Sequence, residues 1–202
     1  MVLGLTIPGD GVIESQRGNI IADDRQLVGA RAAYMGQSDY LLPWLTVRHN
    51  VTLGRRLRGG KRHEGLDRAN ELLNAVGLGD VADRYPIALS GGMRQRVALA
   101  RTLFEDRSII CMDEPFSKLD AITRLKLQDL AGETLKDKTV LLVTHDPLES
   151  LRLGHRVIVL GGHPAAIVEC QDLPGDPARD PTNTSLLALQ SEFLRALGTA
   201  LS

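Results

Sequence analysis

The stretch LSGGMRQRVALAR, residues 89–101, decides how the rest of the chain is interpreted. Ser90 is a favourable N-cap, and Gly91 and Gly92 let bare backbone N–H groups approach an anion at the start of a helix, where the helix dipole favours negative charge. Helical spacing continues through the rest of the stretch. The pattern predicts a helix that begins at a phosphate, although an ordinary capped helix can carry the same three residues.

A second informative stretch, IICM at residues 109–112, is followed by Asp113, Glu114 and Pro115. An apolar run of this length that ends at a proline predicts a buried strand, with both carboxylates at its carboxyl end. In open α/β sheets, ligands bind at that edge. Asp113 can hold Mg²⁺, usually through water, and Glu114 can be the base that polarises an attacking water. Either acid taken alone also fits a residue that merely closes a strand.

Together with SKLD at residues 117–120, these stretches resemble the nucleotide-binding subunit of ATP-binding cassette (ABC) transporters. The resemblance covers residues 4–169, nearly the whole chain. It implies that residues 89–95 form the signature motif and that 109–114 form the Walker B strand, which ends in the catalytic glutamate. ATP and Mg²⁺ are the cofactors that the resemblance implies.

The resemblance also assigns roles to single residues. Gln37 matches the Q-loop glutamine, which reaches the metal and the attacking water, and His145 in VTHD matches the switch histidine, which contacts the γ-phosphate. A lone glutamine or histidine is more often a surface or structural residue, so both assignments depend on their places in the pattern. Asp113 and Gln37 are the expected metal ligands, and Glu114 and His145 the catalytic pair. The residues expected to bind the nucleotide are Ser90, Gly91, Gly92, Gln95, Gln37 and Asp120.

The expected fold is α/β: the P-loop NTPase-like core of an ABC ATPase, truncated at its N-terminus, with an inserted α-helical subdomain. The resemblance places the domains as follows: the first part of the core at residues 1–37, the helical subdomain at 38–88, the signature, Walker B strand, D-loop and switch histidine at 89–171, and a linker with a C-terminal helix at 172–202. The residue patterns predict strands at 32–35, 109–112, 139–143, 156–160 and 166–169, and helices at 64–76, 121–135 and 184–197.

Three local details sharpen these expectations. The strand at 139–143 is expected to be buried, because its residues form an apolar run. Gly77 is expected to end the helix at 64–76. Asp146 and Pro147 predict the cap and first position of another helix directly after His145.

Charge and composition restrict the class of protein. The 202 residues include 24 basic and 25 acidic side chains, so the net charge of −1 argues against a general nucleic-acid binder. No stretch approaches about eighteen consecutive apolar residues, the length that spans a membrane. The first residues lack a basic region followed by an apolar core, so secretion is not expected. These observations make the cytoplasm the default location, and the resemblance to ABC transporter subunits implies a peripheral protein at the cytoplasmic face of the cell membrane.

One family motif has no counterpart in the sequence. The pattern G-x-x-x-x-G-K-[S/T] does not occur, and the nearest segment, GGK at residues 59–61, continues into Arg62 instead of a hydroxyl residue. That loop supplies the backbone cradle for the β-phosphate, a lysine and a hydroxyl ligand for Mg²⁺. The loop is therefore expected to precede residue 1.

The helical subdomain contains two features with more than one interpretation. Trp44, the only tryptophan, lies in LLPWLTV at residues 41–47, and it is either core or part of a docking surface. This segment resembles the corresponding segment in the ATPases of nitrate, sulfonate, taurine and pyrimidine-precursor importers. In those proteins the helical subdomain receives a helix of the permease. The basic cluster at residues 55–63 is either a solvated helix end or a contact with anionic headgroups or the permease.

Three functions are compatible with these observations. We expect the ATP-hydrolysing subunit of an importer for a small solute, with transmembrane permease subunits and a second ABC ATPase subunit as partners. The alternatives are a non-hydrolysing partner that donates only its signature motif and an inactive truncated paralogue. The catalytic and metal-binding side chains named above favour the first, because a chain relieved of catalysis has no physical need for them together. The transported solute is not predicted.

Overall fold

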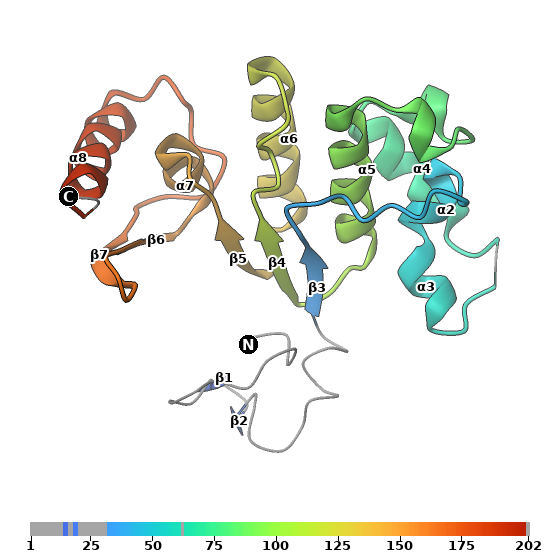
Figure 1. Cartoon of the computed structure of the whole chain (residues 1–202), viewed down its shortest axis with the longest axis horizontal. Helices are drawn as coiled ribbons and strands as arrows, with labels where there is room; N and C mark the ends of the chain where they lie inside the picture. Colours follow the sequence, from blue (N-terminus) through green and yellow to red (C-terminus); the bar gives the residue numbers. More distant parts are fainter. Residues whose placement is uncertain (1–13, 16–17, 20–31, 62, 201–202) are drawn as a thin grey trace. The chain divides into compact units, whose positions relative to one another are not determined.

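The structure is a computed structural model, and it describes residues 14–15, 18–19, 32–61 and 63–200 (Figure 1). Contacts divide the chain into two compact units, Met1–Met112 with Asp137–Leu141, and Asp113–Lys136 with Leu142–Ser202. This division differs from the boundaries at 37, 88 and 171, which stay predictions.

A sheet with the strand order β3-β4-β5 carries the carboxylates. Its strands are β3 (Ala32–Met35), β4 (Ile109–Asp113) and β5 (Thr139–Val143). Strands β3 and β4 are parallel, with Ala32 opposite Ile109 and Met35 opposite Met112, and β5 runs in the same direction (Figure 1). The carboxyl ends of all three strands therefore lie at one edge of the sheet.

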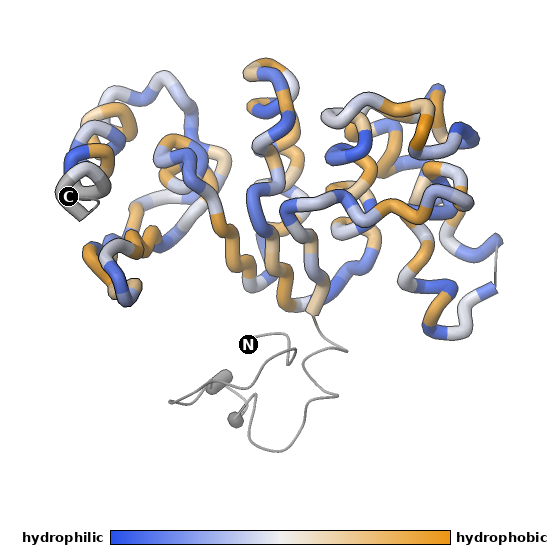
Figure 2. Tube along the Cα trace, viewed as in Figure 1, coloured by the Kyte–Doolittle hydropathy of each residue, from blue (hydrophilic) through white to orange (hydrophobic). Residues whose placement is uncertain are grey.

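Strand β4 is buried, as predicted, but β5 is not. Ile110 in β4 is 1% exposed, whereas Leu141 and Val143 in β5 are 49% and 52% exposed. Strand β5 is the edge strand of the described sheet, so it has a neighbouring strand on one side only. Its apolar residues, shown in Figure 2, correctly predicted a strand, but the prediction of burial was wrong because an apolar run does not distinguish a covered strand from an edge strand.

The described part of the expected helical subdomain contains helices and turns but no strand. Its elements are α2 (Val47–Val51), α3 (Leu53–Leu57), α4 (Leu66–Ala75) and the 3-10 turns η1 (Gly79–Val81) and η2 (Pro86–Ala88). Helices α2 and α4 pack against α5 (Gly91–Phe104) (Figure 1). Helix α4 lies within the predicted range 64–76, and its residues Leu72 and Leu73 are buried. Gly77 ends α4 with a φ of +70°, a conformation that glycine adopts without strain.

The second unit is built around a hairpin and three helices. These elements are α6 (Ala121–Thr134), α7 (Pro147–Leu153), β6 (Arg156–Gly161), β7 (Ala166–Asp172) and α8 (Thr184–Ala200). All five were predicted, with ends that differ by a few residues. The antiparallel pair β6 and β7 directs Val157 and Val159 into a core with Leu151 and Phe193. A separate short antiparallel pair in the first unit is formed by β1 (Glu14–Ser15) and β2 (Gly18–Asn19).

Candidate nucleotide site

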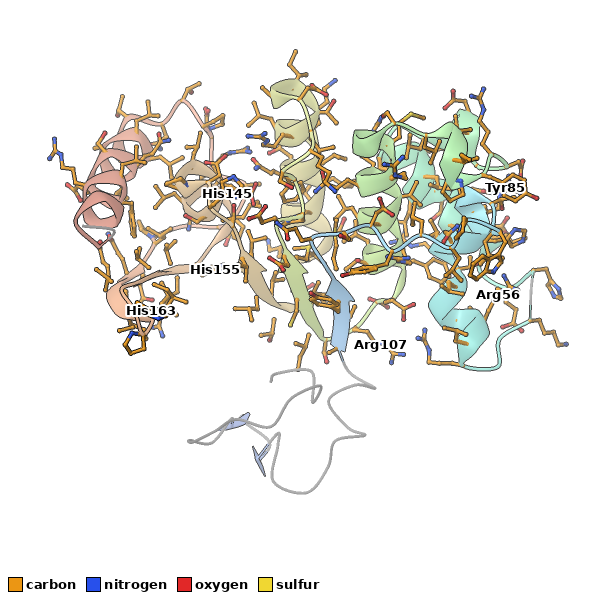
Figure 3. All side chains as sticks on the ribbon, in the orientation of Figure 1. Arg56, Tyr85, Arg107, His145, His155 and His163 are labelled. Carbon is orange, nitrogen blue, oxygen red and sulfur yellow. The ribbon has the colours of Figure 1, made fainter. Side chains whose placement is uncertain are left out.

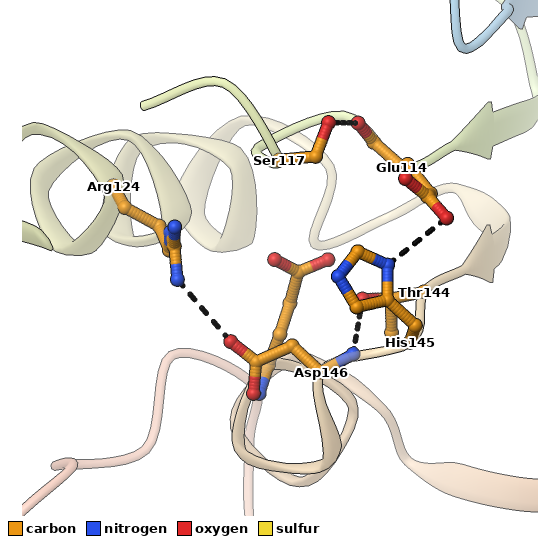
Figure 4. A pocket seen from close by; sticks show the side chains of 7 residues that line it. Glu114, Ser117, Arg124, Thr144, His145 and Asp146 are labelled. Atoms are coloured by element: carbon orange, nitrogen blue, oxygen red, sulfur yellow. Dashed lines mark hydrogen bonds and ion pairs between the residues drawn. The ribbon is translucent and has the colours of Figure 1, made fainter. Parts of the chain in front are cut away.

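The ends of β4 and β5 bring Glu114 and His145 together. The backbone N–H of Glu114 donates to the carbonyl oxygen of Val143 at 2.8 Å, which extends the contact between the strands past the end of β4. His145 follows two residues later, and its Nδ1 lies 2.9 Å from Oε1 of Glu114 (Figure 4). The side chain of His145 is 72% exposed and that of Glu114 is 23% exposed. The two predicted catalytic residues are therefore in direct contact.

Glu114 has a strained backbone. Its φ is +48°, in the left-handed region that residues other than glycine seldom adopt. The Ser117 hydroxyl donates to the Glu114 carbonyl oxygen at 3.1 Å, which helps to hold this turn. Such outliers cost about 1–3 kcal/mol and cluster at functional sites. The observed strain supports a functional interpretation of this position.

A shallow pocket lies beside this pair (Figure 4). About 280 Å³ of space, which includes open solvent, lies among its lining residues, which are Glu114, Ser117, Arg124, Thr144, His145, Asp146 and Glu149. Asp146 caps α7 as predicted, since its Oδ1 accepts from the backbone N–H groups of Leu148 and Glu149 at 3.0 and 3.3 Å. The roles of Arg124 and Glu149 in the pocket were not predicted, although an acid at position 146 and a glutamate three residues later are a helix-start pattern.

Glu149 is a buried carboxyl group in this pocket, with 4% of the residue exposed. Its Oε2 accepts from Nε2 of Gln128 at 3.2 Å, while its Oε1 has no hydrogen-bond partner among the described residues. Burial raises the pKa of Glu149 to about 6, and the negative charge of Asp146 adds to the rise, whereas Thr144, Gln128 and Arg124 act in the opposite direction.

A buried arginine, Arg152, holds Gln128, the hydrogen-bond partner of Glu149. Arg152 is 2% exposed; it donates to Oε1 of Gln128, and its Nη2 lies 2.8 Å from Oδ1 of Asp129. The polar network therefore extends from α6 to α7 beneath the pocket. Its members are far apart in the sequence, and no local pattern predicts their contacts.

The other two predicted acids occupy different surroundings. Asp113 is the last residue of β4 and is half-buried. Asp120 is the N-cap of α6, and its Oδ1 accepts from the backbone N–H of Thr123 at 3.0 Å. Hydrogen bonds from Thr123 lower the pKa of Asp120, which stays ionised at neutral pH. The exposed carboxylate of Asp120 faces solvent.

The signature stretch forms the start of α5 in the other compact unit. Ser90 is its N-cap, as predicted, and the Oγ atom accepts from the backbone N–H of Met93 at 3.2 Å. A Cβ atom added at Gly91 would meet no atom within 4 Å, so packing inside the described chain does not explain this glycine. Gln95 is only 4% exposed and lies within the helix, whereas Ser90 is exposed.

The segment after Gln37 is attached to the same helix. Arg94 pairs with Asp39, with Nε 3.1 Å from Oδ2. Arg101 donates from Nη2 to the carbonyl oxygen of Asp39 at 2.6 Å and from Nη1 to that of Tyr40 at 3.0 Å. Gln37 itself is exposed. These contacts connect positions about 60 residues apart along the chain, and the sequence carried no local signal for them.

Aromatic residues of the helical part lie at its surface. Trp44, Tyr40 and Tyr85 are 70%, 68% and 50% exposed, and Figure 3 labels Tyr85 and Arg56 on this part of the chain. The core interpretation of Trp44 is therefore excluded. Part of the basic cluster is paired within the chain, since Arg55 contacts Glu64 at 3.0 Å.

Comparison with known proteins identifies the family. The family model described as ABC transporter matches residues 1–117, which include the signature stretch and Glu114. An uncharacterised ABC transporter ATP-binding protein of Haemophilus influenzae is 44% identical over 171 residues, which are 83% of this chain and 71% of that protein. The chain belongs to the ABC transporter family.

Two further ABC relatives have more specific names. An aliphatic sulfonates import ATP-binding protein of Pseudomonas syringae pv. tomato is 38% identical over 194 residues, covering 94% of this chain and 78% of that protein. A taurine import ATP-binding protein of Rhizobium johnstonii is 43% identical over 168 residues, covering 81% and 64%. These names describe the relatives.

A solved structure confirms the predicted ABC ATPase fold. It is the dimeric structure of a post-hydrolysis state of the ATP-binding cassette MJ0796 bound to ADP and Pi. The match has a TM-score of 0.74 and 30% sequence identity, and it covers 86% of this chain and 78% of that one. The family and fold predicted from the sequence are therefore confirmed, while the roles of single site residues stay predictions.

Proposed function

We propose that this chain is the ATP-binding and ATP-hydrolysing subunit of an ABC importer and that it energises the uptake of a small solute. The observation that carries the proposal is the contact between Glu114 and His145, 2.9 Å apart, at the carboxyl ends of neighbouring strands of an ABC ATPase sheet. The names of the taurine and sulfonate relatives support the importer class.

The two residues have complementary roles in this proposal. Glu114 polarises the attacking water, because a carboxylate near the end of the strand can accept its proton. His145 contacts the γ-phosphate, because its largely exposed ring can donate a hydrogen bond to a phosphate oxygen. The contact between Nδ1 and Glu114 orients the ring, and both residues line the pocket.

Mg²⁺ fits the proposed site as an ion that protein side chains and nucleotide phosphates bind together. The described residues contain no group of three or more His, Cys, Asp or Glu side chains that could hold a metal ion by themselves. Mg²⁺ is usually bound by one or two carboxylates together with substrate phosphates and water, so the proposed site needs few protein ligands. Asp113 and Gln37, which the family resemblance assigns to the metal, are the proposed ones. When bound, Mg²⁺ neutralises charge on the phosphate oxygens.

A second ATPase subunit is part of the proposal. The signature residues Ser90, Gly91 and Gly92 would contact the phosphates of a nucleotide held by that subunit, and Asp120 would lie at the same nucleotide. The dimeric ATP-binding cassette that matches this fold supports such an arrangement. The empty space around a Cβ atom at Gly91 also supports it, because the glycine is then explained by an outside ligand. Gln95, which is 4% exposed, is a less accessible residue than Ser90 among those proposed to bind the nucleotide.

The proposed remaining partners are the permease subunits, which the chain would contact at the cytoplasmic face of the membrane. Among the described helices, none is long and apolar enough to cross a membrane. The exposed side chains of Tyr40 and Trp44 offer an aromatic contact surface next to the Gln37 segment. Nucleic acid is not a proposed partner.

ATP hydrolysis by the protein isolated from its native cell, with its intact mass determined, tests this function. The mass matters because the 202 residues contain no G-x-x-x-x-G-K-[S/T] stretch. We expect turnover that is lost in Ser90→Arg, which puts a long cationic side chain at the proposed phosphate contact. Ser191→Arg, at an exposed position of α8, is the matched control. Unchanged turnover in Ser90→Arg would contradict the proposal.

A further inference from the structure

Arg124, in the first turn of α6, connects two segments of its compact unit. Its Nη2 donates to the carbonyl oxygen of Leu119 at 3.1 Å, and its Nη1 lies 3.4 Å from Oδ2 of Asp146 (Figure 4). Leu119 belongs to the loop 117–120, and Asp146 directly follows His145. One guanidinium group therefore links this loop to the turn that carries the histidine.

Asp146 can transmit the position of Arg124 to His145. One carboxylate oxygen of Asp146 caps α7, and the other faces Arg124. The backbone N–H of Asp146 also donates to Oγ1 of Thr144 at 3.0 Å, which closes a turn across His145. Because both neighbours of His145 are joined in this way, a displacement of the Asp146 carboxylate moves the histidine as well.

The pocket indicates that this arrangement does more than stabilise the fold. An exposed or half-exposed ion pair contributes only about 0–1 kcal/mol, and Arg124 and Asp146 are 33% and 31% exposed. Moreover, Nε of Arg124 and Oε1 of Glu149 are buried without hydrogen-bond partners among the described residues, although both residues line the same pocket. Unpaired buried polar groups cost free energy, so the stability of the fold does not explain the position of Arg124.

We propose that Arg124 is a positioning residue for His145. It fixes the turn 144–146 relative to the loop 117–120, so that the loop position determines how His145 faces Glu114. Arg124 touches no reacting atom in this account. The inference rests on the proposed function, in which His145 contacts the γ-phosphate.

Two variants break the link from opposite sides. Arg124→Gln removes the charge and the forked donor, whereas Asp146→Asn keeps an oxygen that can cap α7 and weakens only the pairing with Arg124. Lys126→Gln changes the charge at an exposed position of the same helix and is the matched control. Because Asp146→Asn preserves the cap, the test does not depend on the stability of Arg124→Gln alone.

The first measurement is the NMR signal of the His145 ring nitrogens in the isotope-labelled protein, which reports the contact with Glu114 without requiring ATP. Both variants should shift this signal, and the double variant should shift it no further than either single variant, because all three remove one link. The control should leave the signal in place. The second measurement is turnover, in which both variants should lower kcat about 10-fold while KM for ATP changes less than about twofold.

The outcomes separate the two proposals. If the His145 ring signals stay in place in both Arg124→Gln and Asp146→Asn, the positioning role is overturned. It is also overturned if the signals shift and His145→Ala abolishes turnover, but kcat is unchanged in both Arg124→Gln and Asp146→Asn. Shifted signals combined with normal turnover in His145→Ala would instead overturn the proposed role of His145, while the structural link from Arg124 would stand.

Discussion

The signature region, residues 89–104, and the switch region, residues 114–120 and 143–149, carry the proposed chemistry in different ways. The signature region offers backbone groups at the start of a helix whose body is buried, with Val97 and Ala100 at 0% exposure. The switch region offers charged side chains that are held by one another beside an open pocket. Apolar packing therefore supports the first region, and polar contacts set the geometry of the second.

Truncating one leucine in the signature region and one next to the switch region should test this difference in packing most strongly. Leu99→Ala removes a side chain that is 1% exposed in α5, and we expect a loss of about 2–5 kcal/mol in the free energy of unfolding. Leu141→Ala, in the strand that leads to the switch region, removes a side chain that is 49% exposed and should cost less than about 1 kcal/mol. Denaturant unfolding measures both. Equal losses in the two variants would contradict the comparison, because they would show that Leu141 is buried to the same extent as Leu99.

The pH dependence of stability should reveal the buried carboxyl group of the switch region. The pKa of Glu149 is raised from its ordinary value of 4.5 to about 6, so the folded state holds a proton that the unfolded state releases between these values. Its contribution to stability is therefore complete below pH 4.5 and is lost as the pH rises through about 6.

Glu149→Gln removes this titration and keeps a side-chain oxygen for Gln128. Above pH 6 the variant should be about 2 kcal/mol more stable than the wild type, and the difference should vanish below pH 4.5. Unfolding at pH 4 and pH 7.5 tests this expectation, because the other acids titrate alike in both proteins. A difference that does not change with pH would mean that Glu149 has an ordinary pKa.

Gly91→Ala should have the smallest effect on stability and still separate the two regions. The added methyl group meets no described atom, and alanine is the better helix former, so we expect a gain of at most about 1 kcal/mol. Nucleotide affinity should fall nevertheless, since the methyl group would occupy the space of the proposed phosphate contact. A destabilised variant would instead show that neighbouring structure requires glycine here.

Much of the fold and the reactive residues of the site could be predicted from the sequence. The runs at 32–35 and 109–112 predicted β3 and β4, and the second run placed Glu114 at the carboxyl end of a strand, where ligands bind. The structure added that the strand before His145 is its neighbour and that the two side chains are in contact. Caps at Ser90 and Asp146 could also be predicted, because they depend on local hydrogen bonds.

The remaining contacts depend on distant residues. The hydrogen bonds from Arg101 to the Asp39 segment and from Gln128 to Glu149 form only once the helices have packed. The exposure of β5 was wrongly predicted for the same reason, since an apolar run specifies a strand but not what covers it. Local patterns therefore identify the reactive residues, whereas the groups that hold them in place require the structure.

The most direct test of the account is ATP turnover and ATP binding by Glu114→Gln in the protein as isolated from its native cell, with Glu133→Gln, at an exposed position of α6, as the control. The account predicts that Glu114→Gln lowers turnover by at least about 100-fold, the typical contribution of a general base, while a fluorescent ATP analogue binds with nearly unchanged affinity. Turnover that matches the control would contradict the assignment of Glu114 as the base.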